Sequence, residues 1–310
     1  MIQFSKHLSC SFLLLLLPLS IVHAQWAPRP ITQQADSLMQ HGKFKEALNT
    51  YREGYRQNPK DQYHLEQLVF ALGRIGQLDS CFKYLAIKTR NDTSAAYFVE
   101  GSFYYLLEDP RWKTFQDDMI ARINYKMGNP YKDLDYARAL WRMQVRDQAF
   151  YPEDQVAEQE FGFDNPLSKA IWELKERLNH ENQAELIALI EKKGWPRKSQ
   201  VGGLAASAAF FIIQHSDTQK QMRFLPEIKK LCAQKEANWP EYALMYDRIE
   251  LAQGRPQRYG SQLNFNPMTN QYELGNLEDP AKVDTWRQEV GLEPLAEYLA
   301  NWGLKWEAPK

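Results

Sequence analysis

The chain has 310 residues, of which 44% are apolar and 25% charged, and its formal net charge is −1. Residues 1–24 hold one basic side chain, Lys6, and no acidic one, so the remainder stays close to neutral, with 37 basic and 39 acidic side chains. This balance excludes the basic surface of a protein that binds nucleic acid or anionic lipid. The aromatic content of 13% can fill hydrophobic cores and excludes a disordered chain.

The amino terminus has the pattern of a signal peptide. Lys6 is followed by an apolar stretch from Phe12 to Val22, and the small residue Ala24 stands where a signal peptidase would cut. The apolar stretch is about half as long as a helix that spans a bilayer. We therefore predict that residues 1–24 are removed, that the mature chain begins at Gln25 without a membrane span, and that it is exported, periplasmic or secreted.

A repeat with a period of thirty-four residues follows. Small and apolar residues recur at this spacing, pairing Ala35 with Val69, Leu38 with Leu72, Gly42 with Gly76, Phe44 with Leu78, Ala47 with Cys81 and Tyr51 with Leu85. Small residues let two helices approach, and the glycines permit the turn between them. The pattern resembles the tetratricopeptide repeat, which implies pairs of antiparallel helices over residues 28–128.

A third unit is expected to begin near Ala96, because two repeats rarely bury a continuous core. The segment Tyr97–Leu107 has a helical, apolar pattern, and Pro110 stands where the glycine is expected. We interpret it as a degenerate repeat or a capping helix pair. Stacked repeats form a groove that commonly holds a protein or peptide partner, and the alternative is that they only hold the second domain in place. The predicted groove positions are Thr32, Asp36, Tyr63, Glu66, Phe70 and Arg74.

Residues 131–310 predict a helical domain with one small β-hairpin, so the expected fold class is mainly α. The predicted helices and breaks, in chain order, are a helix from Asp133 to about Phe150, a loop from Glu153 to Asp164, a helix that starts at Pro166 with Asn165 as its N-cap, a further amphipathic helix that ends at Gly194, an apolar helix from Val201 to Gln214, a helix capped by Asp217, and a helix from Pro240 to Gly254. Strands are expected within Pro256–Phe265 and Gln271–Leu274, followed by short helices near Trp286 and Tyr298.

Polar residues stand in this apolar domain where packing does not require them. They are Arg146, Asp147 and Gln148; Gln214, His215, Ser216 and Asp217; Asp247 and Arg248; Gln257, Tyr259, Gly260 and Gln262; and Arg287. With the Gly194, Trp195, Pro196 turn, this ordered set resembles an uncharacterised bacterial family, domain of unknown function 6624. The resemblance covers about Asp133 to Tyr298 and implies no activity.

The chemistry of these side chains suggests a site. His215 ends the most apolar helix, and a carboxylate from Asp217, Asp247 or Asp147 beside it would make a general base with an orienting partner. We name His215, Asp217 and Asp247 as catalytic candidates. The predicted ligand-binding residues are Asp147, Gln148, Arg248, Gln257, Tyr259, Gln262 and Arg287. We expect His215, Asp247, Gln257 and Tyr259 to converge around one pocket.

Each of these residues also has a structural interpretation, in which Asp217 is an N-cap, His215 satisfies a carbonyl, and Asp247 with Arg248 braces the hairpin. No metal and no cofactor is predicted, because His41, His64, His180 and His215 include no pair at ligand spacing, and the sequence has no glycine-rich phosphate loop. Cys81 and Cys232 are predicted to be free, buried thiols. Two functions remain open: a binding or scaffold module of the cell envelope, and a hydrolase of an envelope glycan or peptide.

Overall fold

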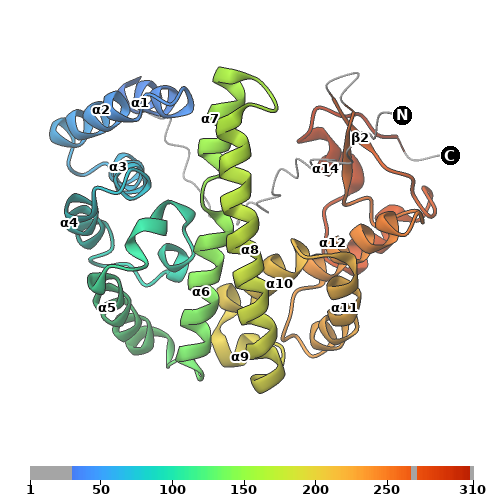
Figure 1. Cartoon of the computed structure of the whole chain (residues 1–310). Helices are drawn as coiled ribbons and strands as arrows, with labels where there is room; N and C mark the ends of the chain where they lie inside the picture. The colour runs from blue at the N-terminus through green and yellow to red at the C-terminus, as the bar shows by residue number, and fades with distance from the viewer. Residues whose placement is uncertain (1–29, 267–270, 308–310) are drawn as a thin grey trace.

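The protein is mainly α-helical, as predicted. Its structure is a computed structural model that describes residues 30–266 and 271–307. The helices of the first half are α1 (Pro30–Gln40), α2 (Phe44–Gln57), α3 (Gln62–Arg74), α4 (Leu78–Lys88), α5 (Pro110–Met127), α6 (Leu134–Gln148), α7 (Tyr151–Phe161) and α8 (Pro166–Lys193). Helices α1 to α5 follow one another along one side of the molecule, and α6, α7 and α8 run through its middle (Figure 1).

The second half is built around one apolar helix. Its elements are α9 (Lys198–Val201), α10 (Gly203–Gln214), α11 (Thr218–Ala233), α12 (Trp239–Ala252), the strands β1 (Leu263–Asn266) and β2 (Gln271–Leu274), α13 (Val283–Glu289) and α14 (Leu295–Ala300). Helix α10 contacts α6, α8, α11 and α12, and most of its residues are buried. An all-apolar helix belongs at such a centre, because every face is covered.

Helices α1 to α4 form successive packed pairs, α1 with α2 and α3 with α4, and α2 also contacts α3. The paired repeat positions Ala35 and Val69, and Ala47 and Cys81, are all fully buried. Helices α2 and α3 pack so closely at Gly54 that no side chain fits there. A Cβ atom added to Gly54 would lie 2.3 Å from the His64 ring. The spacing of small residues therefore sets how tightly these helices pack.

The segment after α4 differs from the prediction. In place of a regular helix there are two 3₁₀ helices, η1 (Ala95–Phe98) and η2 (Gly101–Leu106), and η2 packs on α3. Non-helical backbone angles at Phe103 interrupt the segment, and the Glu100 side chain caps η2 by accepting from the Ser102 amide. Asp109 then caps α5, with Pro110 in its first turn. Only the second helix of the expected third pair is regular.

A loop was also predicted for residues 153–164, and this prediction was wrong, because helix α7 occupies Tyr151–Phe161. Phe150, in the left-handed region at φ 70°, separates α6 from α7, and Pro152 lies in the first turn of α7, where a proline is tolerated. Asp154 and Ala157 are buried, and the Trp172 indole of α8 donates to Asp154 at 2.9 Å. Packing against α8 outweighs the polar composition that indicated a loop.

The largest hydrophobic core extends across both halves of the chain. It joins Phe98 of η1 and Met119 and Ile123 of α5 to Trp141 of α6 and to the apolar face of α10. The rings of Phe98 and Trp141 lie 4.6 Å apart between centroids. A second core fills α1 to α4, and Phe115 packs against both.

The remaining predictions for the second half are largely confirmed. Asn165 caps α8, Asp217 caps α11, and Gly194 follows the last residue of α8. The hairpin is shorter than expected, since β1 begins at Leu263, and part of its predicted turn, 267–270, lies outside the described residues.

The two cysteines of the described chain, Cys81 and Cys232, are free and buried, as predicted. No helix in the described ranges is both long enough and apolar enough to span a bilayer.

Candidate functional site

The predicted histidine forms a close pair with a buried carboxylate. At the carboxyl end of α10, Nδ1 of His215 lies 2.7 Å from Oδ1 of Asp147, which belongs to the last turn of α6. The Asp147 side chain is 1% exposed and that of His215 is 13% exposed. Because a carboxylate only accepts hydrogen bonds, Nδ1 carries the proton. Within the described part of the chain, Nε2 has no partner, and in the neutral form of the ring it would present a lone pair.

The surroundings of Asp147 keep its carboxylate ionised. Burial acts to raise the pKa of Asp147, but the adjacent His215 ring and the nearby Lys175 ammonium outweigh it and hold this pKa below its usual value. Gln148 adds a hydrogen bond, from Nε2 to Oδ2 of Asp147, at 2.7 Å. The predicted residues Asp147, Gln148 and His215 therefore form one cluster.

Lys175 belongs to the same region, although sequence reasoning did not identify it. From the middle of α8 its Nζ donates to the main-chain oxygens of Asp147 and Ala149, at 2.9 and 2.8 Å, and lies 3.4 Å from the centre of the Tyr151 ring. Burial lowers the pKa of Lys175 to about 8. With two carbonyls and an aromatic face as partners, the ammonium fixes the bend between α6 and α7 and thereby the position of Asp147.

Arg248 connects the end of α10 to the loop before the hairpin. From α12, one guanidinium nitrogen donates to the main-chain oxygen of Gln214 at 2.8 Å, and Nε lies 3.4 Å from Oε1 of Gln262. The predicted ligand residues Gln257 and Gln262 bond to each other twice, through the Gln257 side-chain amide and the Gln262 main chain. Both side chains are buried, so these contacts hold the loop in a fixed shape.

Asp247 ties the same loop from beneath and does not bond to His215. Its carboxylate is fully buried and accepts the amides of Arg258, Tyr259 and Ser261, together with the Ser261 hydroxyl. Burial raises the pKa of Asp247, and these hydrogen bonds oppose the rise. The contacts agree with the structural interpretation of Asp247 as a brace for the hairpin.

Arg287 bonds to the main chain of Tyr259 and so holds the loop before the hairpin. One Arg287 guanidinium nitrogen donates to the main-chain oxygen of Tyr259 at 2.6 Å, and its Nε donates to that of Glu293. Arg287 is 1% exposed. These two predicted ligand residues therefore join the loop to α13.

The Asp217 side chain bonds neither to the Asp147–Gln148–His215 cluster nor to the loop that Asp247 holds. It is exposed, its side chain accepts the Lys220 amide at 2.9 Å, and the same carboxylate pairs with the Lys220 ammonium. Of the three catalytic candidates, only His215 has a place in the carboxylate–imidazole pair. The carboxylate in that pair comes from Asp147.

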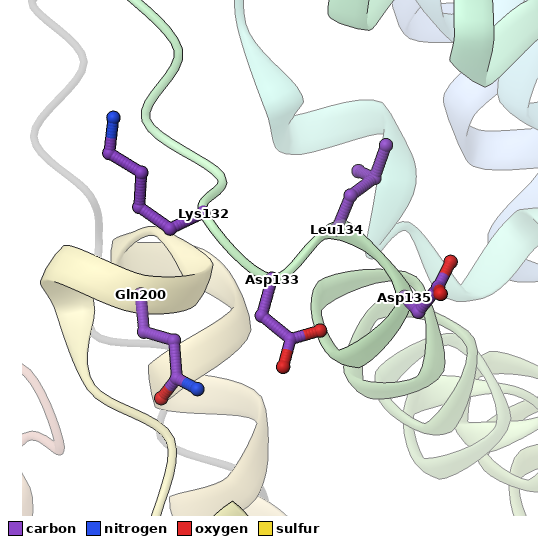
Figure 2. A pocket seen from close by; sticks show the side chains of 5 residues that line it. All are labelled: Lys132, Asp133, Leu134, Asp135 and Gln200. Atoms are coloured by element: carbon purple, nitrogen blue, oxygen red, sulfur yellow. The ribbon is translucent and has the colours of Figure 1, made fainter.

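A separate cavity opens at the start of α6. Its volume is about 450 Å³, and it is lined by Lys132, Asp133, Leu134, Asp135 and Gln200. Figure 2 shows the Asp133 and Gln200 side chains on the same side of the loop and Lys132 on the other. Asp133 is already engaged, since it caps α6 and pairs with Lys193. None of the predicted site residues lines this cavity.

The fold and these contacts define a mainly helical protein with a buried carboxylate–imidazole pair and a loop held by a buried aspartate. No cluster of three metal-binding side chains occurs among residues 30–266 and 271–307. A family model described as "Family of unknown function (DUF6624)" matches residues 134–305, more than half of the chain, and the protein belongs to this family. The match confirms the resemblance noted in its C-terminal half. No curated protein and no solved structure matches the chain significantly.

Proposed function

We propose that this protein is an exported binding protein that takes a polar ligand at His215. The observation that carries the proposal is the 2.7 Å contact between His215 and Asp147. A buried carboxylate fixes the imidazole so that Nε2 can accept a hydrogen bond from a hydroxyl or ammonium group of a ligand. The His215–Asp147 pair supports a binding role better than a purely structural one, because Nε2 remains available to a ligand.

Export is supported by Lys6, the apolar stretch Phe12–Val22 and Ala24, all of which lie outside the described residues. The test is fractionation of the source cells followed by amino-terminal sequencing of the protein. A chain that begins at Gln25 in the periplasm or medium is the expected result. A chain that keeps Met1 in the cytoplasm contradicts export.

The helix pairs α1 with α2 and α3 with α4, which we take to be tetratricopeptide-like repeats, support a scaffold role better than a peptide groove. Two of the expected groove residues on α3 are partly covered by the chain itself, because Tyr97 donates to Glu66 at 2.9 Å and Phe70 packs on Phe103. Their function is then to hold η1, η2 and α5 against α6. A peptide bound along α3 would have to displace η2.

The ligand is tested by analysing what the protein carries. The full-length exported chain is purified beside the variants His215→Gln and Asp217→Asn, and bound small molecules are measured by mass spectrometry. We expect a ligand in near-stoichiometric amount in the wild type and in Asp217→Asn, and its loss from His215→Gln at an unchanged melting temperature. No bound molecule in the wild type, or equal amounts in all three proteins, contradicts the proposal.

A second function, hydrolysis of an envelope glycan or peptide, is favoured by the same pair. An imidazole oriented by a carboxylate is the arrangement of a general base, which removes a proton from an attacking water or hydroxyl. In Asp147→Asn, Nδ1 no longer faces a charged acceptor, so turnover is expected to fall by about 10²–10⁴-fold. Assays of ester, peptide and glycan substrates test this, and turnover unaffected by Asp147→Asn excludes the pair from the reaction.

A further inference from the structure

The turn between α7 and α8 displays three large apolar side chains. Phe161 is 68% exposed, Phe163 is 70% exposed and Leu167 is 50% exposed, and they lie within seven residues of one another. In Figure 1 this turn forms the upper end of the central helices, away from the contacts of α8 with α10. We call Phe161, Phe163 and Leu167 the aromatic tip.

The aromatic tip rests on an ordered turn. Asn165, which is 6% exposed, donates through its side-chain amide to the main-chain oxygens of Ala157 and Gly162, and its side-chain oxygen accepts the Ser168 amide. The loop of 162–165 is therefore bonded to both helices. Such a turn presents its apolar groups in a set position, which lowers the entropic cost of docking.

Acidic side chains are frequent in the chain on both sides of the aromatic tip. Residues 158–173 contain four acidic side chains and one basic side chain, Lys169, which pairs with Asp164 at 3.0 Å. Among the described residues, Glu158, Glu160 and Glu173 form no ion pair. Burial and the neighbouring Asp154 raise the pKa of Glu158, as expected where negative charge is not neutralised.

We propose that the aromatic tip docks into a partner protein that offers an apolar recess bordered by lysine or arginine side chains. Apolar contact supplies the attraction at short range, and the opposite charges steer and orient the partner. An anionic lipid surface or a nucleic acid is excluded as the occupant, because both would be repelled by the surrounding carboxylates. This docking surface is a second interaction site, distinct from the ligand site proposed at His215.

The probe is a synthetic peptide of alternating lysine and leucine, with lysine–serine and glutamate–leucine peptides of equal length as comparisons. Binding to the full chain is measured by fluorescence anisotropy at low and high salt. We expect the lysine–leucine peptide to bind most tightly and to weaken with salt. The double variant Phe161→Ser/Phe163→Ser is expected to bind it at least about tenfold more weakly, or about 1.4 kcal/mol.

The control variant is Tyr125→Ser, since Tyr125 is 96% exposed on α5 beside Lys126 and lies outside the acidic surroundings. It is expected to bind like the wild type, and Glu158→Gln/Glu160→Gln is expected to lose the salt dependence. Equal binding by all variants, or a lysine–serine peptide that binds as tightly as the lysine–leucine peptide, overturns the proposal. So does sedimentation that reveals a dimer lost in Phe161→Ser/Phe163→Ser, because the tip would then bind a second copy of this chain.

Discussion

Replacing Asp247 by asparagine is expected to destabilise the protein strongly while leaving the His215 pair in place. Asp247 is fully buried and accepts four hydrogen bonds, three of them from main-chain amides at 2.8–3.0 Å. An asparagine keeps one acceptor oxygen and places an amide group where the other stood. In either orientation, a buried N–H of the 258–261 loop then faces a donor.

The expected loss follows from the cost of unsatisfied buried groups. One unpaired buried amide costs about 1–3 kcal/mol, and the exchange of charged for neutral hydrogen bonds adds to it, so the free energy of unfolding is expected to fall by about 2–4 kcal/mol. The assay is urea denaturation followed by circular dichroism. Asp217→Asn is the matched control, because asparagine is an equally good N-cap and the exposed pair with Lys220 is worth under about 1 kcal/mol. Equal stability of the two variants would refute a bracing role for Asp247.

Three further changes test other parts of the structure by the same denaturation assay. Lys175→Met removes the donor to two buried carbonyls and is expected to cost about 2–4 kcal/mol; a neutral effect would show that Lys175 does not fix the α6–α7 bend. Burial raises the pKa of Glu241, so its contribution to stability is lost as the pH rises through the native pKa. Glu241→Gln, which keeps an acceptor for Ser207, should therefore be more stable than the wild type near about pH 8 and lose this advantage near about pH 4. Gly54→Ala places a methyl group 2.3 Å from the His64 ring and is expected to cost about 1–3 kcal/mol; an unchanged stability would mean that α2 and α3 separate easily.

The architecture could be predicted where it depends on local signals. Helix starts and stops at Asn165, Gly194 and Asp217 follow from capping and turn chemistry, and the all-apolar α10 indicates its own central position. Helix α7 was missed because it is short and polar, and the hydrogen bond that supports it, from Trp172 to Asp154, comes from the next helix, α8. Amino-acid composition alone cannot predict that hydrogen bond.

The sequence identified most residues of the candidate site but not which of them contact one another. His215 and Asp147 are separated by 68 positions, and nothing in the sequence chose Asp147 over Asp217 or Asp247 as the partner of the histidine. Lys175 could not be identified, because a lysine on an amphipathic helix ordinarily extends into solvent. Whether these residues bind or transform a ligand stays a prediction for the experiments above.

The shared core has a practical consequence for anyone who cuts this chain. A fragment limited to the family region, 134–305, would lack Phe98, Met119 and Ile123 and would leave the Trp141 ring facing water. We expect such a fragment to aggregate when it is expressed alone, and one that also keeps α1 to α5 to remain soluble. Residues before 134 thus complete the hydrophobic core of the family region.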